Sequence, residues 1–128
     1  MRKVITSENA PKAIGPYSAA IETETFVFTS GQLGLDPKTG ELVSGGIETE
    51  THQAIKNLNE VLKVSGSDLK LVVKTTVFLK DINEFSLMNN IYALYFKDEP
   101  PARSAFQVAA LPKNASVEIE AVAIKVSR

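Results

Sequence analysis

Hydrophobic residues recur along this chain with two different spacings, which separate predicted helices from predicted strands. Residues 47–64 carry apolar side chains at three- and four-residue intervals, with polar residues between them, as in an amphipathic helix. Residues 83–96 show a second such stripe, which a Pro-Pro pair ends. Residues 70–79 are rich in Val, Thr and Phe and predict a strand. Residues 102–108 and 117–126 predict the last two strands.

The N-terminal third predicts shorter strands separated by loops. Residues 4–7 are typical of a short edge strand, and residues 18–22 and 26–30 of a hairpin. Pro and Gly interrupt residues 9–17 and residues 36–40, which we expect to form a loop and a turn.

These elements predict one α+β domain over residues 1–128, with a five- to six-stranded sheet and two helices on one face. Two helices, each about 10 Å wide, cover only one face of such a sheet, whose strands lie about 4.8 Å apart. Both alternating sets of side chains in residues 117–126 are largely apolar. We therefore expect the uncovered face to pack against other subunits in a closed homo-oligomer.

Composition narrows the functional classes. The chain has 128 residues, of which 44% are hydrophobic and 23% charged, as in a soluble globular domain. Its formal net charge of −1 gives no bulk attraction to nucleic acid or to an anionic membrane. No apolar run approaches the roughly 20 residues of a membrane span. The first residues turn polar too soon for a signal peptide, so we expect a cytoplasmic location.

The chain has no cysteine and a single histidine, His52. Disulfides, thiolate zinc sites and a cysteine nucleophile are therefore excluded, and no metal site is expected. His52 lies near the start of the first predicted helix, with Glu48 one turn before it. We interpret it as a solvated helix residue.

Two charged residues stand in segments that otherwise resemble buried strands. They are Arg103 and Glu118. An ionised group in a strand core is costly unless it is paired or used. A guanidinium facing a carboxylate would provide a fork for a small carboxylate ligand and a base for water, which indicates an enzyme. The pattern equally allows a structural ion pair across neighbouring strands.

Several motifs resemble the Rid deaminase family, also called YjgF and often labelled translation-inhibitor endoribonuclease. Residues 101–104 read Pro-Ala-Arg-Ser, residues 111–112 read Leu-Pro, and residues 117–121 read Val-Glu-Ile-Glu-Ala. Five earlier segments also look like family motifs and occur in the family's order: residues 13–18, 29–32, 36–40, 73–79 and 88–92.

The resemblance implies a chorismate-mutase-like fold and a homotrimer around a central β-barrel, with ligand clefts between subunits. It also implies a 2-iminobutanoate/2-iminopropanoate deaminase. Such an enzyme hydrolyses reactive 2-imino acids, or enamine tautomers such as 2-aminoacrylate, to 2-keto acids and ammonia. No cofactor is expected.

Within that resemblance, Arg103 would hold the substrate carboxylate through two parallel hydrogen bonds. Glu118 would take a proton from water and return it to the departing nitrogen. Burial should raise the pKa of Glu118 and Arg103 should lower it, and the sequence leaves that balance open. Glu120 shares a strand face with Glu118 and is assigned to an interface or a salt bridge.

Three other residues match supporting polar positions of the family: Tyr17, Ser30 and Asn89. The backbone N–H of Gly31 could approach a ligand closely because glycine has no side chain. Local roles stay open: Tyr17 as a cap on the core, Ser30 in a turn, and Asn89 in a helix-end hydrogen bond. Ala105 stands where some members carry cysteine, and we favour a role through its backbone N–H.

Two alternatives to the deaminase remain. One is a non-catalytic module that binds or senses small carboxylates such as 2-keto acids. The other is an endoribonuclease or translation inhibitor, against which the slightly acidic charge, the single histidine and the absence of a basic-aromatic patch argue.

Overall fold

Both helices form where the hydrophobic spacing predicts them. In the computed structural model, which describes residues 1–126, helix α1 spans Ile47–Val64, as predicted. Its stripe of Ala54, Ile55, Leu58, Val61 and Leu62 is completely buried. Helix α2 spans Phe85–Tyr95 and is shorter than predicted, because Ile82–Glu84 form a 3-10 turn capped by the Asp81 side chain.

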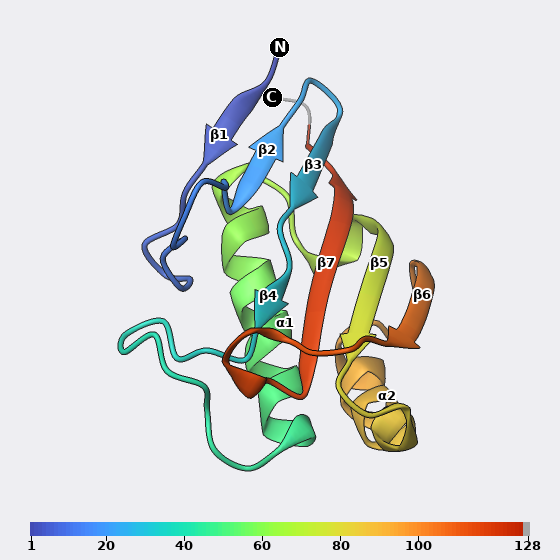
Figure 1. The fold of residues 1–128 in the computed structure, drawn as a ribbon. Coiled ribbons are helices and arrows are strands. Elements are labelled where there is room, and N and C mark those ends of the chain that lie inside the picture. The colour runs from blue at the N-terminus through green and yellow to red at the C-terminus, as the bar shows by residue number, and fades with distance from the viewer. Residues whose placement is uncertain (127–128) are drawn as a thin grey trace.

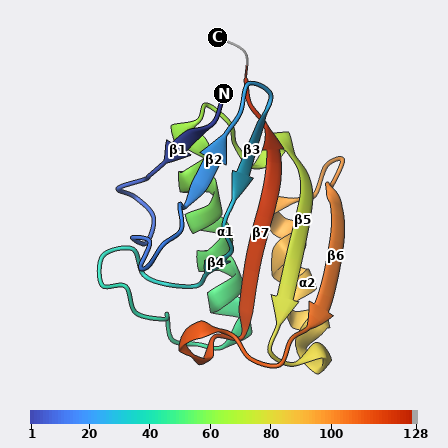
Figure 2. The same ribbon diagram turned by 45° about the horizontal axis from the view of Figure 1, so that its top comes forward.

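Among the described residues, the strands form one mixed sheet of seven, in the order β1-β2-β3-β7-β5-β6, with β4 pairing separately with β7. Their bounds are β1 Lys3–Ile5, β2 Ala20–Glu22, β3 Phe26–Thr29, β4 Gln32–Leu33, β5 Val72–Leu79, β6 Ala102–Gln107 and β7 Val117–Ile124. Figures 1 and 2 show β7 between β3 and β5, with β6 at the far edge. The count exceeds the expected five or six because the chain breaks after β3 and pairs again as β4.

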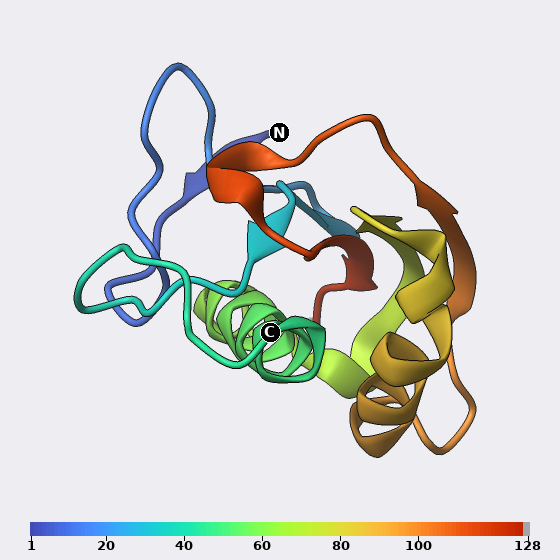
Figure 3. The same ribbon diagram turned by 60° about the horizontal axis from the view of Figure 1, so that its bottom comes forward.

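The two faces of the sheet have different environments. Both helices lie on one side of it (Figure 3), which confirms the α+β arrangement. On β7, the side chains of Val117, Ile119, Ala121 and Ala123 are buried beneath the helices. The alternate residues point to the other face, where the strand register also places exposed apolar side chains: Val4, Phe26, Phe28, Phe106 and Ile124.

A buried carboxylate ties helix α1 to the start of β7. Glu50 is almost fully buried, and its Oε1 accepts a hydrogen bond from the backbone N–H of Ser116 at 2.7 Å. A buried carboxylate is tolerated when a donor satisfies it. The bond therefore fixes the chain two residues before Glu118.

The interpretation of His52 as a solvated residue was wrong. Its ring is half-buried, and its Nδ1 lies 2.8 Å from the hydroxyl of Tyr95 on α2. The C-terminal half of α2 packs against this part of α1, a contact between distant segments that the local pattern does not reveal. No helix within residues 1–126 combines the length and apolar character that crossing a membrane requires.

Candidate active site

The sheet register separates Arg103 and Glu118. Strand β5 lies between β6 and β7, with Thr75 opposite Arg103 and Phe78 opposite Glu118. Successive side chains on a strand point to opposite faces, and directly opposite residues share a face. Arg103 therefore faces the helices with buried Thr75, whereas Glu118 lies on the open face.

Within one chain, the expected guanidinium facing a carboxylate does not form. The alternative of an ion pair across neighbouring strands is wrong for the same reason, because the strands are not neighbours and the side chains point to opposite faces. Among residues 1–126, the only salt bridges join Lys63 to Glu60 and Lys125 to Glu22.

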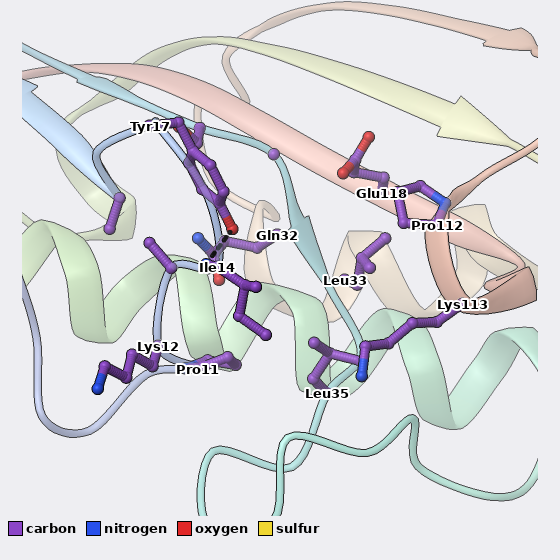
Figure 4. A pocket seen from close by; sticks show the side chains of 14 residues that line it. Pro11, Lys12, Ile14, Tyr17, Gln32, Leu33, Leu35, Pro112, Lys113 and Glu118 are labelled. Carbon is purple, nitrogen blue, oxygen red and sulfur yellow. Dashed lines mark hydrogen bonds between the residues drawn. The ribbon is translucent and has the colours of Figure 1, made fainter.

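Glu118 lies in a pocket of about 470 Å³ with Tyr17, Ser30 and Gly31. We call these four residues the Glu118 half-site. Figure 4 shows Tyr17 entering from the N-terminal loop and Leu33 next to Glu118. The rest of the wall is largely apolar and includes Pro11, Ile14, Leu33, Leu35 and Pro112. This size and lining suit a small organic ligand.

The Glu118 carboxyl is half-buried and in contact with Gly31. Burial, followed by the negative charge of Glu120, raises the pKa of Glu118 above its ordinary value. The sequence left open whether burial or Arg103 has the larger effect on the pKa of Glu118. Within one chain burial has the larger effect, because Arg103 faces away. A Cβ on Gly31 would lie 2.7 Å from Cδ of Glu118, so glycine is required for this approach.

Tyr17 and Ser30 shape the pocket through contacts within the N-terminal segment. The side chain of Tyr17 is 52% exposed, and its hydroxyl accepts a long hydrogen bond of 3.4 Å from the backbone N–H of Ile14. The alternative of a core cap is therefore wrong. Ser30 Oγ donates to the carbonyl of Ser18 at 2.6 Å, which leaves its oxygen free to accept from a ligand.

Arg103 lies in a separate hollow of about 360 Å³, which Asn89 also lines. Its Nη1 donates to Oδ1 of Asn89 at 2.7 Å. We call Arg103 and Asn89 the Arg103 half-site. The bond joins β6 to α2, so Asn89 is not limited to local helix bonding.

The rings of Phe85 and Tyr92 also contact Arg103. Both rings belong to the apolar stripe that predicts a helix over residues 83–96. Phe85 lies four residues before Asn89 and Tyr92 three residues after it, so all three share one helix face. This spacing is the signal in the sequence that identifies the two rings as neighbours of the site.

Ala105 shares the helix-facing side of β6 with Arg103 and packs half-buried against the core. It lines neither of the two hollows, so its backbone role stays a prediction. Within residues 1–126, no group of three or more His, Cys, Asp or Glu side chains is arranged to hold a metal ion.

Comparisons with known proteins agree over nearly the whole chain. The family model described as Endoribonuclease L-PSP matches residues 7–125. A human protein named 2-iminobutanoate/2-iminopropanoate deaminase is 55% identical over 125 residues, which covers 98% of this chain and 91% of the human one. The chain is thus similar to a curated enzyme along nearly its full length.

Solved structures give the same result. YyfA of Yersinia pestis, described as a protein of the conserved Rid family, superimposes with a TM-score of 0.93 at 48% identity, covering 98% of this chain and 100% of that one. Escherichia coli TdcF, solved with bound serine, gives a TM-score of 0.91 at 35% identity, covering 97% of this chain and 99% of that one.

Proposed function

This chain belongs to the Rid (YjgF) family, whose family model is described as Endoribonuclease L-PSP, and we propose that it hydrolyses 2-imino acids to 2-keto acids and ammonia. The 55% identity to the human deaminase supports this reaction. The strongest support in the structure is the Glu118 half-site. It sets a carboxylate of raised pKa in an apolar pocket of small-ligand size.

We propose that a second copy of the chain completes the site. The Glu118 half-site lies on the open face of the sheet, and the Arg103 half-site lies beside α2 near the β6 edge. The open face carries exposed Phe26, Phe28 and Ile124, as expected of a surface that pairs with another subunit. In a homotrimer, each cleft would take one half-site from each of two neighbours.

In this site, Arg103 binds the substrate carboxylate. Asn89 occupies one of its N–H groups, and the others remain for a planar pair of oxygens. This contact fixes both the position and the plane of the imino acid. Much of the rate then comes from orientation, since the imine carbon is already electrophilic.

Glu118 transfers the protons. The ionised carboxylate accepts a proton from water as the water oxygen bonds to the imine carbon, the C=N electron pair moves to nitrogen, and Glu118 passes that proton to the nitrogen. In the resulting amino alcohol, Glu118 takes the hydroxyl proton and delivers it to the nitrogen, the O–H electron pair forms the C=O bond, and ammonia leaves with the C–N electron pair. A raised pKa makes this carboxylate a stronger base near neutral pH.

The apolar wall indicates which side chains fit. Leu33 stands directly opposite Glu118 in the β4–β7 register, so their side chains share a face. Leu35 and Ile14 continue the wall. An imino acid with a short aliphatic side chain would therefore bury apolar surface beside the reacting carbon.

An imine-hydrolysis assay tests this function. Threonine dehydratase generates the imino acid, semicarbazide competes for it, and keto-acid release is followed with and without the protein. The wild type should accelerate hydrolysis. Glu118→Gln should lower kcat by about 100-fold or more. Arg103→Lys should raise KM by about tenfold, as expected for one lost charge-assisted bond.

Two matched variants control for charge and folding. Glu24→Gln and Arg2→Lys make the same changes at exposed positions and should behave as wild type. Binding of 2-oxobutanoate without turnover on several amino-acid precursors would contradict the deaminase and support a carboxylate-binding module. RNA cleavage that survives Arg103→Ala would support a ribonuclease instead.

A further inference from the structure

The guanidinium of Arg103 is held between side chains from α2. Its Cζ lies 4.7 Å from the ring centroid of Tyr92 and 5.4 Å from that of Phe85. Asn89 accepts from its Nη1 on the same helix face. A guanidinium over aromatic faces gains cation–π attraction, which is greatest where the group is partly desolvated.

The Tyr92 ring is itself fixed in the core. Tyr92 is 5% exposed, and its hydroxyl lies 2.7 Å from Oγ1 of Thr75, which is fully buried. Phe96 packs against the ring at a centroid distance of 4.5 Å. Thr75 stands opposite Arg103 in the β5–β6 register, so β5 supports Arg103 through Tyr92.

These contacts restrict a side chain that is otherwise flexible. An arginine side chain has several rotatable bonds and loses rotamer entropy when a ligand orders it. Here the rings hold the guanidinium, and Asn89 takes one N–H. Within residues 1–126, no carboxylate forms a salt bridge with Arg103. The remaining N–H groups are therefore already oriented and available to an external carboxylate.

We infer that Phe85, Tyr92 and Thr75 are positioning residues that hold the guanidinium of Arg103 ready for a planar carboxylate. The inference rests on the proposed role of Arg103 as the carboxylate-binding group. It predicts that these residues affect recognition of the carboxylate and leave the rest of the ligand unaffected. The carboxylate is the same in substrate and transition state, so the effect falls on KM more than on kcat.

The test compares a carboxylate ligand with its neutral analogue. Binding of 2-oxobutanoate and of 2-oxobutanamide is measured by titration calorimetry for the wild type, Phe85→Leu, Tyr92→Phe and Thr75→Val. Phe85→Leu should weaken 2-oxobutanoate binding by about tenfold, and the two hydroxyl deletions by about threefold. Binding of the amide should stay as in the wild type. In the imine assay, KM should rise by similar factors with kcat nearly unchanged.

Two further variants separate positioning from general stability. Phe85→Tyr keeps an aromatic face and should bind 2-oxobutanoate as the wild type does. Tyr95→Phe deletes a hydroxyl on the same helix that bonds to His52, away from Arg103, and should change neither affinity. Circular dichroism melts identify any variant that fails to fold, and the other variants then carry the comparison.

Three results would overturn the inference. The first is an equal loss of affinity for the acid and for the amide in these variants. The second is unchanged acid binding in Phe85→Leu and Tyr92→Phe while Arg103→Lys loses it. The third is no binding of the acid by the wild type. Because the binding arm needs no turnover, it decides the inference even if the chain hydrolyses no imine. Failure of the deaminase function would appear only in the kinetic arm.

Discussion

At the scale of single residues, the contact between Gly31 and Glu118 most tightly constrains the candidate site. Glu118 needs a half-buried position to raise its pKa, and the open face of a sheet would normally leave it exposed. The backbone of Gly31 approaches closely enough to cover it, because no Cβ intervenes. One glycine therefore contributes to the basicity of the carboxylate and to its position.

We predict that Gly31→Ala removes activity without unfolding the chain. The added Cβ would lie 2.7 to 2.9 Å from Cδ, Cγ and Oε2 of Glu118. The end of a glutamate side chain can rotate away, so the carboxylate moves while the backbone stays. The expected result is a fall in kcat of about 100-fold, comparable to loss of the general base, with little change in melting temperature.

Binding of 2-oxobutanoate provides the internal control for Gly31→Ala. Arg103 is unchanged in this variant, so the carboxylate should still bind. Wild-type kcat in folded Gly31→Ala would show that the position of Glu118 is not critical.

At the scale of elements, the position of β5 between β6 and β7 decides the geometry of the site. One intervening strand and the alternation of side chains put Arg103 beside α2 and Glu118 on the open face. A salt bridge also joins β7 to β2, on the side of β7 away from β5. Lys125, just after β7, donates to Oε2 of buried Glu22 on β2 at 2.7 Å, across the intervening β3.

We predict that this salt bridge makes stability depend on pH in the acid range. The hydrogen bond from Lys125 lowers the pKa of Glu22 below its ordinary value, so the folded chain favours the ionised form. The stabilisation is complete above the unfolded pKa of about 4.3 and is lost as pH falls through the lower folded pKa. Glu22→Gln should therefore melt below the wild type at pH 7.

The acid range provides the discriminating measurement. Melting followed by circular dichroism from pH 7 to about pH 3 should show the difference between Glu22→Gln and wild type shrinking as the pH falls. Glu24→Gln, at an exposed position in the same hairpin, should match the wild type throughout. A difference that stays constant with pH would show that the charge of Glu22 does not contribute.

At the scale of the whole molecule, the two half-sites and the exposed apolar face point to assembly. An isolated chain presents Phe26, Phe28 and Ile124 to solvent on the open face, and leaves a carboxylate pocket and an arginine hollow apart. A neighbouring subunit that covers the apolar face would also join complementary halves. Stability and activity would then both require contact with a neighbouring subunit.

We predict that mixing two inactive variants restores activity. Arg103→Ala chains keep the Glu118 half-site, and Glu118→Gln chains keep the Arg103 half-site. Random mixing in a cyclic trimer would place one intact half of each kind together in about one quarter of the clefts. Equal amounts of the two variants, unfolded and refolded together, should therefore recover about a quarter of wild-type kcat per site.

Each variant refolded alone is the control and should stay inactive. No recovery in mixtures that light scattering shows to be trimeric would mean that both halves of each site come from one chain. A monomeric mass for the wild type would contradict the trimer itself.

Local chemistry made much of this protein predictable from its sequence. Backbone geometry sets the period of the apolar stripe, so the bounds of α1 were predicted correctly. The alternation along residues 117–126 likewise divides the side chains of β7 into two sets, and these are the two faces that differ in burial. Residue type alone also singled out Arg103 and Glu118, since charges in apolar strands are uncommon.

The sequence by itself thus determined the helices, the two faces of β7 and the residue types of the candidate site. Only the tertiary structure decided that β5 separates Arg103 from Glu118, that Tyr17 stays exposed, and that α2 covers His52. The spacing of apolar residues in a helix or strand is set by residues close together along the chain, and a sequence shows these directly. Strand order and helix packing depend on the burial of surfaces from distant segments, and no local pattern records which segments those will be.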